Sequence, residues 1–205
     1  MTQMGFRFDQ TRCTGCNTCA VACKDWHDID AGPVNWMQVN LIENGRFPNP
    51  SVAYLVRPCY QCANPPCVMA CPVDAITKRE ADGIVVVDEA KCLGNTMCNT
   101  LCLNACPWDA PQFGSEKNAK MQKCDLCLER LEQGQQTICV EACPMYALDA
   151  GSLDQLKATY GDTTEADGFS YSERFRPSVI FKPKRPHKAG TRRRGNDTGG
   201  NDDTG

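Results

Sequence analysis

The arrangement of the cysteines constrains this chain more than any other feature of its sequence. The chain has 205 residues, of which 16 are cysteines, and every cysteine falls into one of four groups of four. At this density, cysteine chemistry holds a small fold together in place of a large apolar core. In chain order, the groups are Cys13, Cys16, Cys19 and Cys23; Cys59, Cys62, Cys67 and Cys71; Cys92, Cys98, Cys102 and Cys106; and Cys124, Cys127, Cys139 and Cys143.

Three kinds of chemistry use so many thiols: disulfides, zinc sites and iron–sulfur clusters. Disulfides need an oxidising compartment, and the first eight residues contain neither an apolar signal segment nor a twin-arginine signal. Zinc needs four ligands around one tetrahedral ion, which group four could provide as two cysteine pairs. The closely spaced cysteines of group one would crowd a single ion. We therefore expect reduced thiols that bind iron–sulfur clusters.

Group one has the spacing C-x2-C-x2-C-x3-C, which is typical of bacterial ferredoxins. The first three cysteines curl around one cubane cluster, and the fourth ligates a different cluster. Backbone N–H groups of such a loop face the sulfides and stabilise their negative charge. In the other three groups a proline follows the last cysteine and turns the chain away from the cluster. These pairs are Cys71-Pro72, Cys106-Pro107 and Cys143-Pro144.

Together these motifs resemble the four-cluster ferredoxin-like subunits of the dimethyl sulfoxide reductase superfamily, which serve molybdenum or tungsten enzymes. The resemblance is carried by residues 13–25, 59–72, 106–113 and 123–127, and it extends over residues 6–150. It implies an α+β fold of two bacterial-ferredoxin-like units, each with short hairpins and helices and each holding two clusters.

The resemblance also implies how the units divide the chain. Unit one combines residues 1–50 and 114–150, which contain groups one and four. Unit two, residues 51–113, contains groups two and three and is inserted into unit one. Residues 151–183 form a C-terminal extension that packs on the body or on a partner. Residues 184–205 are basic and then rich in Gly, Asn, Asp and Thr, so we expect a disordered tail there.

In this family the groups exchange ligands. The resemblance implies four [4Fe–4S] clusters, each held by three cysteines of one group and one cysteine of another. The expected ligand sets are set one, Cys13, Cys16, Cys19 and Cys143; set two, Cys124, Cys127, Cys139 and Cys23; set three, Cys59, Cys62, Cys67 and Cys106; and set four, Cys92, Cys98, Cys102 and Cys71. Each cluster takes the number of its ligand set. The family arrangement places cluster one beside the catalytic subunit and cluster four at the far end.

Group three departs from the family spacing, which is C-x2-C-x2-C-x3-C. Here the spacing is Cys92-x5-Cys98-x3-Cys102-x3-Cys106, and Asn95 stands where the second cysteine is expected. Two readings remain open. Either a longer loop still delivers Cys92, Cys98 and Cys102 to a [4Fe–4S] cluster, or one thiol misses the site. In the second case cluster four is a [3Fe–4S] cluster, or Asn95 or water completes it.

Several other residues lie near the cysteine groups. Lys24 and Lys123 flank cysteines and either raise a cluster potential electrostatically or are solvated. His27 could tune or ligate a cluster, but we favour a surface or loop histidine. Trp108 could lie against cluster three, but packing explains it as well. The chain has no Gly-rich phosphate loop, and its two histidines support no Ser-His-Asp site. We therefore expect no catalytic residue and no enzymatic activity of the chain on its own.

The resemblance implies an electron-transfer subunit. Its partners would be a large molybdopterin-dinucleotide catalytic subunit with Mo or W and either an integral-membrane quinone-reactive subunit or a soluble redox protein. One alternative is the iron–sulfur subunit of a hydrogenase or formate-linked complex. A different class is a structural zinc protein with a nucleic-acid-binding tail, because residues 174–205 carry nine Lys and Arg against three Asp. We interpret that segment as solvated and expect no nucleic acid.

No apolar stretch approaches the length of a membrane span, so we expect none in this chain. The expected location is the cytoplasm or the cytoplasmic face of the membrane, and the alternative is export while bound to a signal-bearing catalytic subunit. Local patterns predict a strand at residues 51–56, one arm of a hairpin at 83–88, a helix at 125–133 ended by Gly134, a helix at 152–160 capped by Ser152, and an extended segment at 175–183.

Overall fold

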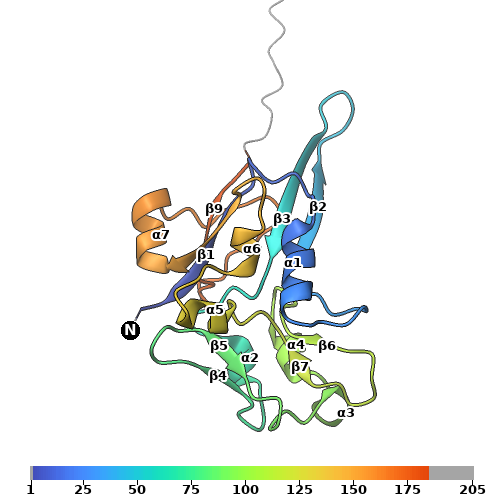
Figure 1. The fold of residues 1–205 in the computed structure, drawn as a ribbon. Coiled ribbons are helices and arrows are strands. Elements are labelled where there is room, and N and C mark those ends of the chain that lie inside the picture. The colour runs from blue at the N-terminus through green and yellow to red at the C-terminus, as the bar shows by residue number, and fades with distance from the viewer. Residues whose placement is uncertain (1, 185–205) are drawn as a thin grey trace, which may run out of the picture.

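The computed structural model describes residues 2–184 and combines short strands with short helices, as the sequence predicts (Figure 1). The strands are β1 (Met4–Asp9), β2 (Gln38–Asn44), β3 (Ser51–Arg57), β4 (Ile76–Lys78), β5 (Val85–Val87), β6 (Gln112–Phe113), β7 (Met121–Gln122), β8 (Leu148–Ser152) and β9 (Val179–Lys182). The helices are α1 (Thr18–Trp26), α2 (Pro66–Met69), α3 (Asn95–Cys98), α4 (Leu101–Ala105), α5 (Leu128–Glu132), α6 (Ile138–Glu141) and α7 (Leu153–Tyr160). Apart from Lys184, the expected tail lies outside the described residues.

A three-stranded sheet brings three distant parts of the chain together. Strand β1 pairs antiparallel with β8 and parallel with β9. Because side chains alternate across a strand, Phe6 and Phe8 share one face of β1, where each is 2% exposed in the core. Strand β9 lies within the extended segment predicted at residues 175–183, and α7 packs against β1 and β8.

The other six strands form three two-stranded hairpins. Strands β2 and β3 pair along their whole length and form an arm that leads away from the body (Figure 1). The strand predicted at residues 51–56 is β3. Strands β4 and β5 form the hairpin whose second arm the sequence predicts at residues 83–88, and β6 pairs with β7.

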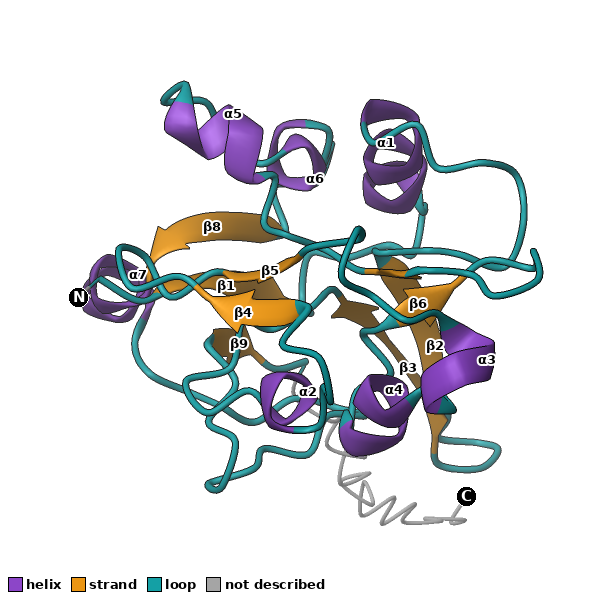
Figure 2. Ribbon diagram, turned by 90° about the horizontal axis from the view of Figure 1, so that it is seen from below, coloured by secondary structure: helices purple, strands orange, loops and turns teal. Residues whose placement is uncertain are grey.

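The helices lie on opposite sides of the strands. Figure 2 shows α1, α5 and α6 on one side and α2 and α4 on the other. Helix α1 packs against α6, and α2 packs against α4. Helices α1 and α6 are far apart in the sequence, whereas α2 and α4 both lie within residues 66–105.

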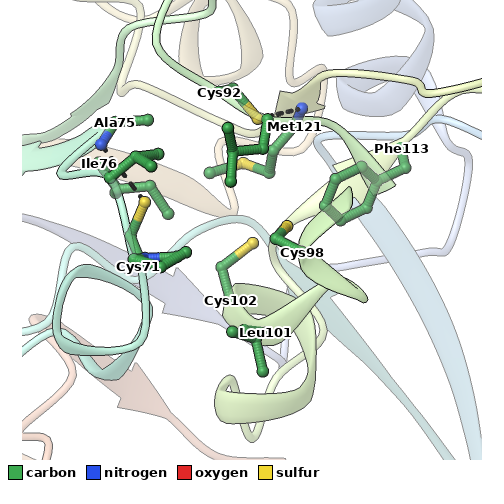
Figure 3. Close-up of a pocket in the computed structure, with 12 residues that line it drawn as sticks. Cys71, Ala75, Ile76, Cys92, Cys98, Leu101, Cys102, Phe113 and Met121 are labelled. Carbon is green, nitrogen blue, oxygen red and sulfur yellow. Dashed lines mark hydrogen bonds between the residues drawn. The ribbon is translucent and has the colours of Figure 1, made fainter. Parts of the chain in front are cut away.

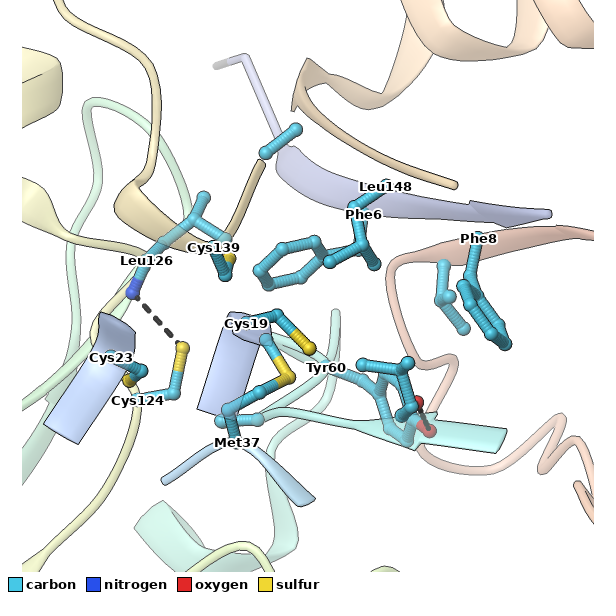
Figure 4. Close-up of a cluster of buried hydrophobic side chains, with 14 of the residues drawn as sticks. Phe6, Phe8, Cys19, Cys23, Met37, Tyr60, Cys124, Leu126, Cys139 and Leu148 are labelled. Atoms are coloured by element: carbon cyan, nitrogen blue, oxygen red, sulfur yellow. Dashed lines mark hydrogen bonds between the residues drawn. The ribbon is translucent and has the colours of Figure 1, made fainter. Parts of the chain in front are cut away.

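Cysteines make up much of the buried interior. Ten of the 16 are buried, five are half-buried and one is exposed. The larger apolar cluster includes Phe6, Met37 and Leu126 among several cysteines (Figure 4). A second, smaller cluster contains Met121 and Val85 together with cysteines of groups two and three. The thiols therefore occupy positions that aliphatic side chains fill in ordinary cores, as the composition predicts.

Two local predictions need correction. Helix α5 begins at Leu128 and not at residue 125, because Leu126 and Cys127 have left-handed φ values of 64° and 51°. The backbone N–H of Cys127 instead donates to Asp125 Oδ1 at 2.9 Å. Ser152 occupies the N-cap position of α7, but its side chain makes no capping hydrogen bond. Within residues 2–184, no helix is both long enough and apolar enough to cross a bilayer.

Candidate metal centres

Three cavities are each lined by four cysteines, and they correspond to sets one, three and four. The lining cysteines are Cys13, Cys16, Cys19 and Cys143 in the first; Cys59, Cys62, Cys67 and Cys106 in the second; and Cys71, Cys92, Cys98 and Cys102 in the third. The equal numbers of sulfur donors indicate that all three cavities suit the same kind of guest.

Two pairs of packed helices produce this grouping. Each of the four helices contributes two cysteines, one to each of two sets. These cysteines lie within the helix or directly after its end. In the first pair, α1 carries Cys19 and Cys23, and α6 carries Cys139 and leads to Cys143. In the second pair, α2 carries Cys67 and leads to Cys71, and α4 carries Cys102 and ends at Cys106. Helix packing therefore brings cysteines of different groups together.

The cavity of set one lies beneath the loop that precedes α1. Gly15 has a left-handed φ of 71°, and a Cβ there would lie 2.3 Å from the ring of Tyr54, so only glycine fits. Cys16 is exposed and accepts a hydrogen bond from Thr18 Oγ1 at 3.4 Å, which lowers the pKa of this thiol. Burial raises the pKa of Cys19 to about 12. Set one thus has one edge at the molecular surface.

The cysteines of set two belong to the larger apolar cluster or adjoin it, and Figure 4 shows three of them. The backbone N–H of Leu126 donates to Cys124 Sγ, with 3.4 Å between the atoms. Thr137 Oγ1 lies 3.4 Å from Cys139 Sγ. Burial raises the pKa of Cys23 well above its ordinary value, and the nearby charge of Cys139 adds to this effect. These mutual effects show that thiols from α1 and α6 lie close together.

Set four resolves the unusual spacing of group three. Its cavity is shown in Figure 3, with Cys71, Cys92, Cys98 and Cys102 pointing into a common space. The additional residues form α3, which ends at Cys98. Asn95, at the first position of α3, does not line the cavity. The geometry therefore favours the reading in which a longer loop delivers Cys98.

Three loops with the sequence Cys-Pro-x-x-Ala have the same local conformation. The residue three positions after the cysteine has a left-handed φ in each loop: 49° at Asp74, 52° at Asp109 and 49° at Tyr146. The turn directs the alanine N–H toward the cysteine sulfur. The nitrogen-to-sulfur distance is 3.3 Å for Ala75 and Cys71 and 3.4 Å for Ala147 and Cys143. The sequence showed the proline and the small residue, but only the structure identifies these hydrogen-bond donors.

The sulfurs surround cavities and do not converge on a point. Within residues 2–184, no three Cys, His, Asp or Glu side chains come close enough to hold one metal ion. A zinc site needs its sulfurs about 2.3 Å from a single ion, whereas a cubane cluster fills the space between them. Burial raises the pKa of Cys102 to about 11 and that of Cys139 to about 12. Such thiols ionise when metal supplies positive charge, so the donors fit iron–sulfur clusters.

The structure shows where His27 and Trp108 lie. His27 Nε2 lies 3.4 Å from Cys127 Sγ, and its ring centroid is 4.6 Å from that of Trp36. His27 lies in the turn after α1, as the loop interpretation predicts, and it is half-buried beside set two and not exposed. Trp108 packs edge-on against Tyr60, and it also lines the cavity of set three.

Comparisons with known proteins agree with these sites. A family model described as a 4Fe-4S dicluster domain matches residues 50–153, and a second model with the same description matches residues 12–75. The matching chain of anaerobic dimethyl sulfoxide reductase from Escherichia coli (strain K12) is 38% identical over 208 residues, which cover 97% of this chain and 95% of the relative. Its Haemophilus influenzae counterpart is 38% identical over 194 residues, with coverage of 90% and 91%.

A relative with lower identity is named for a different enzyme. The matching subunit of sulfite dehydrogenase from Allochromatium vinosum is 33% identical over 167 residues, which cover 72% of this chain and 68% of the relative. The cysteine-lined cavities, the two domain matches and these identities lead to one conclusion. This chain belongs to the family of 4Fe-4S dicluster iron–sulfur subunits that includes these chains of anaerobic dimethyl sulfoxide reductase.

Proposed function

We propose that this chain is the electron-transfer subunit of a molybdoenzyme complex and relays electrons between a molybdopterin catalytic subunit and a second redox partner. One observation carries the proposal: three cavities are each lined by four cysteines, and the remaining four cysteines, Cys23, Cys124, Cys127 and Cys139, are all buried. When bound, each cluster takes up and releases electrons. The chain holds the clusters, buries them and donates hydrogen bonds to their sulfur ligands. It makes and breaks no substrate bond.

The order of the sets supports a continuous path. Sets one and two share the packed helices α1 and α6, and sets three and four share α2 and α4. The middle step joins set two to set three. Burial raises the pKa of Cys124 of set two, and the charge of Cys59 of set three is one of the further causes. Both residues lie in the same apolar cluster. This succession supports a relay in the order one, two, three, four.

We assign the ligands and the domains in line with these contacts. Sets one to four hold [4Fe–4S] clusters one to four, as defined above. Unit one, residues 1–50 and 114–150, is supported by the pairing of β1 with β8 and by the packing of α1 on α6. Unit two, residues 51–113, is supported by the packing of α2 on α4. Residues 151–183 add β9 to the sheet of unit one.

Both ends of the relay offer apolar surface to a partner. At the set-one end, exposed Cys16 lies beside Met145, which is 40% exposed and lines the same cavity. At the set-four end, Leu101 lines the cavity and is 43% exposed, and Met97 is 71% exposed. By analogy with the family, we place the catalytic subunit at set one. An integral-membrane quinone-reactive subunit or a soluble redox protein would then meet set four.

The identity of the complex and its location are the finer parts of the proposal. The E. coli relative is a chain of dimethyl sulfoxide reductase, and its coverage of this chain supports that class of complex. A formate-linked complex is the second candidate, because the iron–sulfur subunit of formate dehydrogenase-O is 32% identical over 73% of this chain. We place the complex at the cytoplasmic face of the membrane. A twin-arginine signal on the catalytic subunit would instead place it outside.

A direct experiment tests the relay. The chain would be purified together with its catalytic subunit, and iron, sulfide and visible absorption would be measured before and after reduction. Adding dimethyl sulfoxide to the reduced complex should restore the absorption of the oxidised clusters. The same addition to the chain alone should change nothing. A colourless chain that contains zinc, or reduced clusters that stay reduced in the complex, would contradict the proposal.

A further inference from the structure

Lys123 is a buried lysine at the junction of sets two and three. Only 2% of its surface is exposed, and its Nζ donates to the carbonyl oxygens of Val85 and of Cys124, the latter at 2.9 Å. It also lines the cavity of set three. Within residues 2–184 its Nζ makes no ion pair with a carboxylate. No side chain in the described part of the chain therefore neutralises its charge.

An ammonium group buried in this way is costly unless an anion lies nearby. Two carbonyl dipoles offset part of that cost, and the thiolate-bound cluster expected in the adjacent cavity would supply negative charge. Lys123 lines that cavity together with the four cysteines of set three. The lysine thus favours negative charge at set three.

Asp125 places the opposite charge on the other side of Cys124. Its Oδ1 accepts the backbone N–H of Cys127 at 2.9 Å, which fixes the carboxylate beside set two. Cys124 is therefore flanked in the sequence by a positive charge that faces set three and a negative charge that faces set two.

Two further lysines lie beside sets three and four. Lys78 Nζ donates to the carbonyl of Cys62 at 2.8 Å, and Lys120 Nζ donates to the carbonyl of Cys92. Neither lysine forms an ion pair within residues 2–184. Lys78 and Lys120 therefore add positive charge beside these two sets.

We propose that Lys123 and Asp125 are positioning residues that set the step in reduction potential between clusters two and three. Lys123 stabilises an added electron at cluster three, and Asp125 disfavours one at cluster two. Together they raise the reduction potential of cluster three relative to that of cluster two. The inference rests on the proposed function, because it assumes that clusters occupy both sets. It goes further by naming residues that are not ligands and the sign of the effect of each.

The principal test is the substitution Lys123→Met in the full chain with its clusters, since methionine matches the length of lysine without its charge. Potentials would be measured by EPR-monitored redox titration, with signals assigned through cysteine variants of each set. At a fixed ambient potential, the ratio of reduced to oxidised cluster three should fall at least tenfold. For a one-electron couple, this corresponds to a downward shift of about 59 mV. Cluster two should shift less, and clusters one and four least.

Two further variants separate charge from structure. Asp125→Asn keeps the hydrogen-bond acceptor and should raise the potential of cluster two. Lys24→Met is the matched control, because Lys24 also adjoins a cysteine in the sequence but its Nζ donates to the carbonyl of Gly32 near the surface, at 3.2 Å. This control should leave all four potentials unchanged. Charge-preserving Lys123→Arg should restore the potential of cluster three.

Each outcome is decisive. If Lys123→Met retains all its iron and all four potentials stay at wild-type values, the inference is overturned. If Lys123→Met fails to assemble, Lys78→Met takes its place, with a smaller downward shift expected for cluster three. Unchanged potentials in both Lys78→Met and Asp125→Asn would then overturn it. Iron analysis of the wild-type chain comes first, and fewer than four clusters there would contradict the proposed function itself.

Discussion

The two helix pairs hold their cysteines in the same way but have different surroundings. In the first pair, α1 has nine residues and lies close to the three-stranded sheet and the β2–β3 arm. In the second pair, α2 has four residues and packs near β4, which belongs to a two-stranded hairpin. In both pairs, cysteines of the two helices line a common cavity. The helix pair is therefore the essential element of each site, and the surrounding strands can vary.

Group three shows how far this tolerance extends. Unit two accommodates the longer spacing by forming α3, with Gly94 at its N-cap in a left-handed conformation of φ 87°. Asn99 and Thr100, both with φ 52°, then turn the chain into α4. An inserted turn of helix thus preserves the position of Cys102 in its helix pair. The comparison of the units leads to four predictions, which run from the largest expected effect to the smallest.

Replacing Cys98 by Ala should remove cluster four and leave the other three clusters in place. The reason is that Cys98 lines the cavity of set four, whereas Asn95 does not. Iron analysis and EPR would detect the loss of one cluster of four. Asn95→Ala is the matched control and should retain all the iron. Full iron content in Cys98→Ala, or loss of a cluster in Asn95→Ala, would show that α3 does not deliver the ligand.

Two buried methionines compare the packing around set four with that of the larger apolar cluster. Met121 is 1% exposed and lines the set-four cavity, and Met37 is 2% exposed in the larger apolar cluster. Replacing either by Ala should destabilise the chain by about 2–5 kcal/mol, measured as a lower midpoint of thermal unfolding. Only Met121→Ala should also change the EPR signal of cluster four, because Met121 lines the cavity of that cluster. If Met37→Ala also changes the EPR signal of cluster four, the proposed difference between the two methionines is contradicted.

A pair of glycines tests the loop over set one. Gly15 and Gly134 have similar φ values, 71° and 73°, but a Cβ at Gly134 would meet no atom within 4 Å. Gly134→Ala should therefore cost only the strain of the left-handed backbone, about 1–2 kcal/mol. Gly15→Ala should cost more, because the ring of Tyr54 must move, and it should weaken the EPR signal of cluster one. Equal losses of stability and an unchanged signal would contradict this view of the loop.

Lowering the pH should destabilise the sheet of unit one. Burial alone would raise the pKa of Asp9, but hydrogen bonds from Thr11 and the charges of Arg7 and Lys182 bring it below its ordinary value. This contribution to stability is complete above about pH 4, the pKa range of an unfolded aspartate, and is lost as the pH falls through the lower folded value. Thermal unfolding measured across this range should show the loss. In Asp9→Asn the dependence should be weaker, and an unchanged dependence would exclude Asp9 as its source.

Local features of the sequence predicted much of the molecule. Cysteine spacing is a local property, so the ferredoxin pattern pointed to cluster loops, and the family resemblance supplied the grouping that the cavities display. Strand β3 and the hairpin strand β5 followed from runs of β-branched and apolar residues. The pairing of β1 with β8 could not be predicted, because it joins Met4 to Ser152 and depends on packing of the whole unit.

The burial of the charged residues beside the cysteines could not be predicted from the sequence. Lys24 and Lys123 look alike in the sequence, since each adjoins a cysteine. Only the fold separates them, because it buries Lys123 against β5 and leaves Lys24 near the surface. The start of α5 was misplaced for a similar reason. Asp125 and Leu126 are compatible with a helix, but the hydrogen bond from the Leu126 N–H to the Cys124 sulfur holds the backbone in another conformation.

The exchange of ligands between helices has a consequence for biosynthesis. All the cysteines of sets three and four have left the ribosome once Cys106 has emerged. Helices α1 and α6 lie on opposite sides of unit two in the sequence, so sets one and two stay incomplete until Cys139 and Cys143 have been translated. Translation therefore completes sets three and four first, then set two at Cys139, and set one last at Cys143.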